Sequence, residues 1–183
     1  MSNARNIANL PNGDDAPIYA CRAWVNFRGT SQSGTLNTSG PVTGLYTATV
    51  TGATTFTIEY SSTTYTVTTS GNLEVGDGEG VDLTISGTSV TIDTQIRESG
   101  NVSTVVDNGT GDYTINFETA MPDANYSVSG SVSWENATWG NTFMLNANTY
   151  STSAVSIVSQ DNDGNIVGYA KKDALIACVQ VFR

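Results

Sequence analysis

The 183-residue sequence has no histidine, and only 13% of its residues are charged. Without histidine, Ser-His-Asp triads, Cys-His nucleophiles and imidazole-bound zinc are all excluded. The two cysteines, Cys21 and Cys178, make no disulfide framework and fit no metal-site spacing. We interpret both as buried small apolar residues, because a bridge between them requires that the first and last strands be neighbours. We expect no cofactor.

Long apolar runs and excess positive charge are also missing. No stretch of eighteen apolar residues occurs, so we expect no membrane insertion, and residues 1–15 lack the apolar core of a secretory signal. Seventeen acidic residues stand against seven basic ones, which gives a net charge of −10. Binding to a phosphate backbone needs a cationic surface, so we expect no nucleic-acid partner.

The chain is instead rich in β-branched and turn-forming residues, including 18 glycines. Short alternating stretches separated by turns are typical of an all-β protein, and we predict an antiparallel β-sandwich. The turn signals include Asn-Gly within 107–111 and Pro-Asp at 122–123. The predicted strands are 18–27, Leu45–Val50, Thr55–Tyr60, Thr64–Thr69, Val81–Ser86, Ser89–Asp93, Gly100–Asp107, Asp112–Phe117, Tyr126–Trp134, Thr142–Asn148, Ala154–Gln160 and Ile176–Phe182.

Residues 1–15 form a separate N-terminal segment in this prediction. Ile7 and Leu10 are spaced i, i+3, and Pro11 follows directly, so we expect a short helical or extended anchor. One helical turn is not stable by itself, and we expect Ile7 and Leu10 to dock against a neighbouring subunit.

The stretch 18–27 is the first confident strand. Its alternation places Tyr19, Cys21, Ala23, Val25 and Phe27 on one face, which we interpret as the core face. We predict that it pairs with Ile176–Phe182, which brings Cys21 near Cys178.

Arg22 and Trp24 lie on the opposite face of that strand. In an acidic protein an Arg–aromatic contact, or a carboxylate on a neighbouring subunit, explains them better than nucleic acid does. We therefore assign Arg22 and Trp24 to a subunit interface.

Two groups of acidic residues are candidates for catalysis or metal binding. Carboxylates in turns, such as Glu74, Glu79 and Glu118, allow acid–base glycan hydrolysis, but acids that cap loops are the commoner case. Residues 161–165 have the opening rhythm of a calcium loop, yet position twelve is a lysine, and a hairpin turn is favoured.

Trp134 and Trp139 flank a short polar stretch. They fit a sugar-stacking platform and a subunit interface equally well, and both alternatives stay open at this point.

Four segments carry a resemblance: "ARNIANL", "ACRAWVNFRGT", "QIRESGNVSTVVDNGTGDYTINFETAMPDANYSV" and the terminal "CVQVFR". They resemble the virion structural, tail-fibre-like proteins of marine and cyanobacterial phages. The matching motifs cover about residues 4–30 and 95–134 and the last few residues. About sixty-five residues intervene where that family often needs only a few, so 31–94 is interpreted as an inserted small β-rich domain. The predicted domains are then 1–15, 16–30 plus 95–183, and 31–94.

The resemblance implies a non-enzymatic virion protein, assembled in the host bacterial cytoplasm. A homotrimeric short tail fibre or knob fits best, joined to other virion proteins through the N-terminal segment. A capsid decoration, a head fibre and an adhesin that binds a host surface glycan are the alternatives. In this interpretation the quoted motifs build scaffold, because each residue in "GDYTINFETAMPDANYSV" has a packing or turn role.

Overall fold

The computed structural model describes residues 21–133, 142–162 and 170–183. These residues form an all-β fold of antiparallel strands, and no helix occurs among them. One sheet runs in the order β11-β15-β1-β8-β2-β6-β5-β4, with β7 on β8 and β3 on β7; the other runs β12-β13-β10-β9, with β14 on β13. The strands are β1 (Cys21–Arg28), β2 (Gln32–Leu36), β3 (Gly44–Thr47), β4 (Thr49–Gly52), β5 (Thr55–Tyr60), β6 (Thr63–Thr69), β7 (Gly80–Ser86), β8 (Ser89–Gly100), β9 (Val102–Asp107), β10 (Asp112–Phe117), β11 (Ser127–Ser133), β12 (Thr142–Tyr150), β13 (Ala154–Asn162), β14 (Ala170–Lys171) and β15 (Ile176–Phe182).

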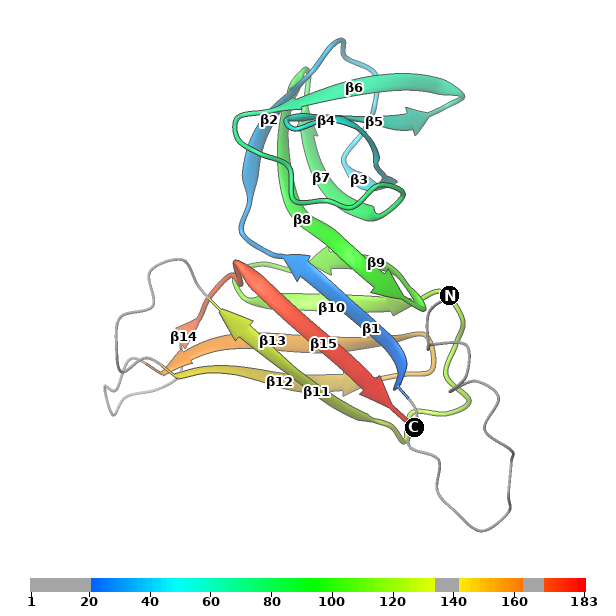
Figure 1. The fold of residues 1–183 in the computed structure, drawn as a ribbon, viewed down its shortest axis with the longest axis vertical. Coiled ribbons are helices and arrows are strands. Elements are labelled where there is room, and N and C mark those ends of the chain that lie inside the picture. The colour runs from blue at the N-terminus through cyan, green and yellow to red at the C-terminus, as the bar shows by residue number, and fades with distance from the viewer. Residues whose placement is uncertain (1–20, 134–141, 163–169) are drawn as a thin grey trace.

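Two layers of strands form the β-sandwich in the lower half of Figure 1. Strands β11, β15, β1 and the end of β8 make one layer, and β12, β13, β10 and β9 make the other. Their alternating inward residues share one core, in which Phe27 and Tyr113 meet edge to face at 5.1 Å between ring centroids. We call this the sandwich core. The predicted β-sandwich is confirmed.

Tyr113 lies at the centre of the sandwich core and is fully buried. Its hydroxyl donates to the Gly29 carbonyl and accepts from the Ala174 backbone N–H, each at 3.2 Å. Burial is the main cause that raises the pKa of the phenol far above its ordinary range. A side chain on Gly29 would collide with the ring, because a β-carbon there would lie 2.2 Å from the Tyr113 hydroxyl. The ring therefore fixes the point where β1 ends.

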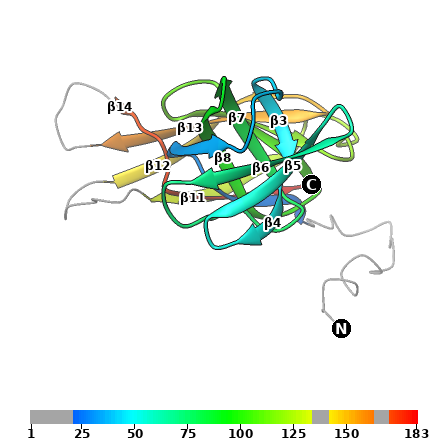
Figure 2. The ribbon, with the colours of Figure 1, turned by 90° about the horizontal axis from the view of Figure 1, so that it is seen from above.

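The upper half of the molecule has a second core. Strands β2 to β7 curl around it together with the first half of β8, and it contains Phe56, Ile58, Leu83 and Ile92, all fully buried. We call this the small core. Seen from above in Figure 2, its strands lie over those of the sandwich.

β8 belongs to both halves. Its first part pairs with β2 and β7, and its last part pairs with β1. Ile92 faces the small core and Ile96 the sandwich core. The strand thus crosses the predicted boundary at 94/95 without a break. The domain limits at 30/31 and 94/95 stay a prediction, and the segment 1–15 lies outside the described residues.

Several predicted strand limits are wrong. β8 continues seven residues beyond Asp93, since Thr94, Gln95 and Ile96 are all buried where the two cores meet and the alternation is lost. The predicted strand Leu45–Val50 is divided into β3 and β4, because Ala48 is buried between them and its N–H donates to the Glu79 carbonyl. β2 was not predicted.

The predicted pairing of the first and last strands is confirmed, since β1 and β15 are antiparallel neighbours. The cysteines are nevertheless apart: Cys21 lies opposite Phe182, and Cys178 lies opposite Asn26. Four residues along β15 correspond to about 13 Å, well beyond the roughly 7 Å limit of a disulfide. Both thiols are free; Cys21 is exposed and Cys178 half-buried, so the interpretation of both as buried residues is wrong.

Candidate functional site

Strands β11, β15, β1 and β8 present one sheet face to solvent, opposite the sandwich core. We call it the outer face. Residues directly across the strands form three rows on it. The rows are Ser127–Phe182–Cys21, then Ser129–Gln180–Trp24–Gly100, then Ser131–Cys178–Asn26–Glu98. The outer face is uneven, because the side chains on β11 are small serines and those on β15 and β1 are larger.

A β-bulge sets which side chains of β1 reach the outer face. Cys21 pairs with Phe182 and Ala23 with Val181, so Arg22 is the extra residue between them. The extra residue moves Cys21 to the outer face, whereas Ala23 is buried in the sandwich core. The prediction that Cys21 lies on the core face is therefore wrong, because strict alternation cannot register an inserted residue.

Trp24 stands in the middle row of the outer face and is 39% exposed. Its indole covers Gly100, where a β-carbon would lie only 2.3 Å from the indole nitrogen. Beside it is a hollow of about 450 Å³. The hollow is lined by Cys21, Trp24, Val25, Asn26, Cys178, Val179, Gln180 and Phe182. We call it the Trp24 hollow.

The extent of the outer face limits what it can hold. Four strands about 4.8 Å apart and seven residues long cover roughly 19 by 23 Å, or about 440 Å². Two such faces bury less than the roughly 1,200 Å² of a stable protein–protein interface. Arg22 and Trp24 alone therefore do not make a complete subunit interface, and their assignment to one stays a prediction.

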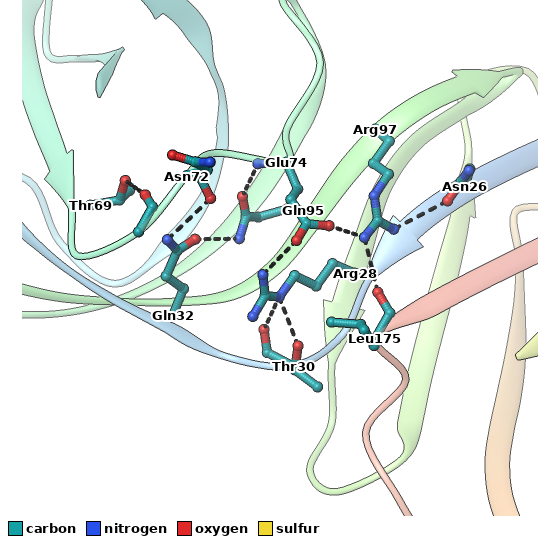
Figure 3. A network of polar contacts seen from close by, with 11 residues as sticks. Asn26, Arg28, Thr30, Gln32, Thr69, Asn72, Glu74, Gln95, Arg97 and Leu175 are labelled. Carbon is teal, nitrogen blue, oxygen red and sulfur yellow. Dashed lines mark hydrogen bonds and ion pairs between the residues drawn. The ribbon is translucent and has the colours of Figure 1, made fainter. Parts of the chain in front are cut away.

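A second constellation joins the two halves of the molecule (Figure 3). Glu74 lies before β7 and receives two guanidinium groups: Arg28 Nη1 lies 2.7 Å from its Oε1, and Arg97 Nη2 contacts its Oε2. Arg97 also donates to the Asn26 side chain and to the Leu175 carbonyl. This ion-pair network connects the loop under the small core to β1, β8 and the start of β15.

Two buried amides extend the network (Figure 3). Gln95 accepts from the Glu74 backbone N–H at 3.0 Å and donates to Gln32 at 2.9 Å, and Gln32 donates to the Asn72 carbonyl. Every buried side-chain amide here has a partner, which holds the junction in one arrangement.

A polar cleft of about 500 Å³ lies on the other side of the junction. Glu79 and Glu118 line it with the hydroxyls of Thr47, Ser99 and Ser103. Both Glu79 oxygens accept from Ser99, one from its backbone N–H and one from its hydroxyl.

The other described carboxylates weighed for hydrolysis also have structural partners. Asp77 accepts from the Val50 N–H and Asp123 pairs with Arg183. Together with the Glu74 ion pairs and the Glu79–Ser99 contacts, these partners favour roles in folding for Glu74, Asp77, Glu79 and Asp123.

Four aspartates cluster where β7, β8 and β9 meet the turn before β15. Burial is the main cause that raises the pKa of Asp82 and of Asp107, and the neighbouring charge of Asp93 adds to both. Asp173 raises the pKa of Asp107 further. The Asp107 backbone N–H donates a hydrogen bond to the Asp82 carboxylate, which lowers the pKa of Asp82 and partly offsets the effect of burial.

The predicted site residues fall into two groups. Arg22 and Trp24 are described, and both are exposed at the start of β1. Ile7, Leu10, Trp134 and Trp139 lie outside the described residues, as does most of the calcium-like stretch 161–165.

Sequence reasoning missed the Glu74 network and the position of Gln180 beside Trp24. The position of Gln180 had one signal in the sequence, the period-2 pattern of β15. This pattern places Gln180 on the exposed face of the strand and Val179 and Val181 on the buried face.

Comparisons with protein-family models, curated proteins and solved structures found no match for this chain. Within the described ranges no group of three or more Cys, Asp or Glu side chains is arranged to hold a metal ion. No helix able to cross a membrane was found among them either.

Proposed function

We propose that this chain is a non-enzymatic structural protein of a bacteriophage virion, a homotrimeric short appendage of the tail-fibre or knob type. The observation that carries the proposal is the place of the motif residues behind the phage resemblance. Tyr113, Ile115 and Phe117 pack in the sandwich core, as Tyr126 does. The motif thus supplies scaffold, which fits a particle component better than an enzyme.

The assembly is proposed to use two surfaces. Arg22 and Trp24 give a small apolar and cationic contribution from the outer face, and Ile7 and Leu10 supply the remainder from the N-terminal segment. A short β chain with a thin second core gains stability when protomers share buried surface. The same N-terminal segment is proposed to join the appendage to other virion proteins after assembly in the host cytoplasm.

Attachment to a host-surface glycan is a second candidate function. It is favoured by the Trp24 hollow, where an exposed aromatic ring lies beside side-chain amides. An appendage can be both structural and adhesive, but Trp24 cannot be buried between subunits and stack on a glycan at the same time.

Electron microscopy of virions labelled with an antibody against this chain tests the structural proposal. Gold particles on tails are the expected result, and gold on capsids supports the head-decoration alternative instead. Unlabelled virions that contain no copy of the chain by mass spectrometry overturn the proposal. Light scattering of the purified chain checks the trimer separately.

A further inference from the structure

The Trp24 hollow has a lining without charge. None of its eight residues is acidic or basic, although the chain as a whole carries a net charge of −10. The lining combines two aromatic rings with the amides of Asn26 and Gln180. A concave site of a few hundred Å³ with aromatic walls and a few placed polar groups is the usual form of a small-molecule site. We infer that the Trp24 hollow binds a neutral saccharide.

The indole of Trp24 provides the stacking surface. The ring lies against Gly100, and no side chain on that residue separates it from the strand. One face of a sugar ring is made of C–H groups, and it packs on an aromatic face in the same apolar contact that favours aromatic side chains in binding sites. The indole is held in place before the ligand arrives, so little conformational freedom is lost on binding.

The amides provide hydrogen bonds at the edge of the ring. Gln180 lies directly across from Trp24 on β15, and its side chain has no hydrogen-bond partner within the described residues. The Asn26 oxygen accepts from Arg97 at 3.2 Å, which leaves the Asn26 N–H groups as donors. Ser129 and Ser131 lie one strand further, about 5 Å away. A planar amide beside an aromatic ring can form hydrogen bonds with neighbouring hydroxyls of a saccharide that stacks on the ring.

Charge and size decide against other occupants. The uncharged lining offers no cation to pair with a sialylated or phosphorylated ligand, and the net charge of the chain repels both. The outer face by itself is too small to hold a second copy of the chain, whereas a di- or trisaccharide needs only the hollow and the neighbouring serines of β11, Ser127, Ser129 and Ser131. The inference goes beyond the structural role in the virion, and it requires that Trp24 stay open to ligand and not be covered by a neighbouring subunit.

The test is saturation-transfer NMR on the purified full chain with five neutral probes: lactose, N-acetyllactosamine, cellotriose, maltotriose and N,N′,N″-triacetylchitotriose. Sialyllactose is the anionic probe. We expect at least one neutral probe to bind with a Kd near 1 mM and sialyllactose to bind more weakly. Trp24→Ala should weaken binding at least about tenfold, the loss expected for removing one stacked ring. Trp24→Phe should retain part of the affinity.

Two more variants separate the site from general effects. Gly100→Ala should weaken binding by displacing the indole, although it changes no group that faces the ligand. Leu45→Ala removes a side chain of similar exposure, 42%, on the upper half of the molecule and should leave binding unchanged. The inference is overturned if none of the probes binds, or if Trp24→Ala and Leu45→Ala bind equally well.

Light scattering on the same samples distinguishes the two proposals. Dissociation of an oligomer by Trp24→Ala, with no saccharide bound by the parent chain, assigns the hollow to the subunit interface and overturns the inference. Failure to bind saccharide alone does not touch the structural proposal, which depends on virion labelling.

Discussion

The two cores of this molecule differ in what fills them. The sandwich core contains four aromatic rings, Phe27, Tyr113, Phe117 and Tyr126, of which two pairs meet edge to face. Among the described residues, Phe56 is the one fully buried ring of the small core, which otherwise depends on aliphatic side chains, with Tyr46 and Tyr65 partly buried at its edge. Aromatic side chains bury the largest areas, so the sandwich core should be the more stable of the two.

The difference suggests how the molecule is organised. β1 and β15 bring the two ends of the described chain together in the sandwich, whereas the small core is closed within 36–92. The small core depends on the sandwich for its base, because β8 is shared and the Glu74 network fixes the junction. The lower half thus acts as the support and the upper half as the part that it carries.

The largest effect is expected from Tyr113→Ala in the sandwich core. The substitution leaves a cavity and removes the partners of the Gly29 carbonyl and the Ala174 N–H, which should lower the free energy of unfolding by about 4–5 kcal/mol. Urea denaturation followed by circular dichroism measures it. Tyr113→Phe is the matched control and should cost only about 1–2 kcal/mol, since it loses the hydroxyl alone. Equal losses for both variants contradict the central role of the ring.

Phe56→Ala should have a smaller and more local effect. The loss of the only fully buried ring of the small core should cost about 3 kcal/mol. Hydrogen exchange should accelerate in β4, β5 and β6 and in the first half of β8, up to Asp93, while β10 and β13 stay protected. Uniform acceleration throughout both halves would show instead that the two cores unfold as one unit.

Much of this fold could be predicted from the pattern of the strands. Ile176–Phe182 and Asp112–Phe117 alternate cleanly, because one side of each faces a core and the other does not. The pattern failed at the bulge, where Arg22 is inserted, and in β8, where burial on both sides removes alternation. The Glu74 network was beyond prediction, since its partners lie 46 and 23 residues away in the chain and meet only through the topology.

Glu74→Gln tests the junction between the two halves. The change leaves Arg28 and Arg97 without their carboxylate at a partly buried position, so we expect a loss of about 1–2 kcal/mol, between the values for exposed and buried pairs. Thermal unfolding measures the loss, and the upper half should become more susceptible to proteolysis. Glu98→Gln, on β8 next to Arg97 but exposed, should change stability by less than about 0.5 kcal/mol. Equal losses of stability in Glu74→Gln and Glu98→Gln would show that the Glu74 network does not stabilise the junction.

The smallest effect concerns pH and the aspartates beneath the small core. The pKa of Asp82 is raised above its ordinary value of 3.8, mainly by burial, so the folded state binds this proton more tightly than the unfolded state does. The resulting stability is complete below the unfolded pKa and is lost as pH rises through the folded pKa. Asp82→Asn removes the charge and keeps an oxygen to accept from the Asp107 N–H, so its Tm at pH 7 should exceed that of the parent chain.

The Tm difference between Asp82→Asn and the parent chain should shrink as the pH falls towards and below 3.8, because Asp82 then becomes protonated and is uncharged like Asn. The difference between the two curves reports Asp82 together with its repulsion of Asp107, whose pKa the Asp82 charge helps to raise. A Tm advantage for Asp82→Asn that is constant over pH would point to packing as its cause. An advantage that is present at neutral pH and fades in acid would show that Asp82 is a destabilising half-buried charge, whereas the sandwich core contains the neutral phenol of Tyr113.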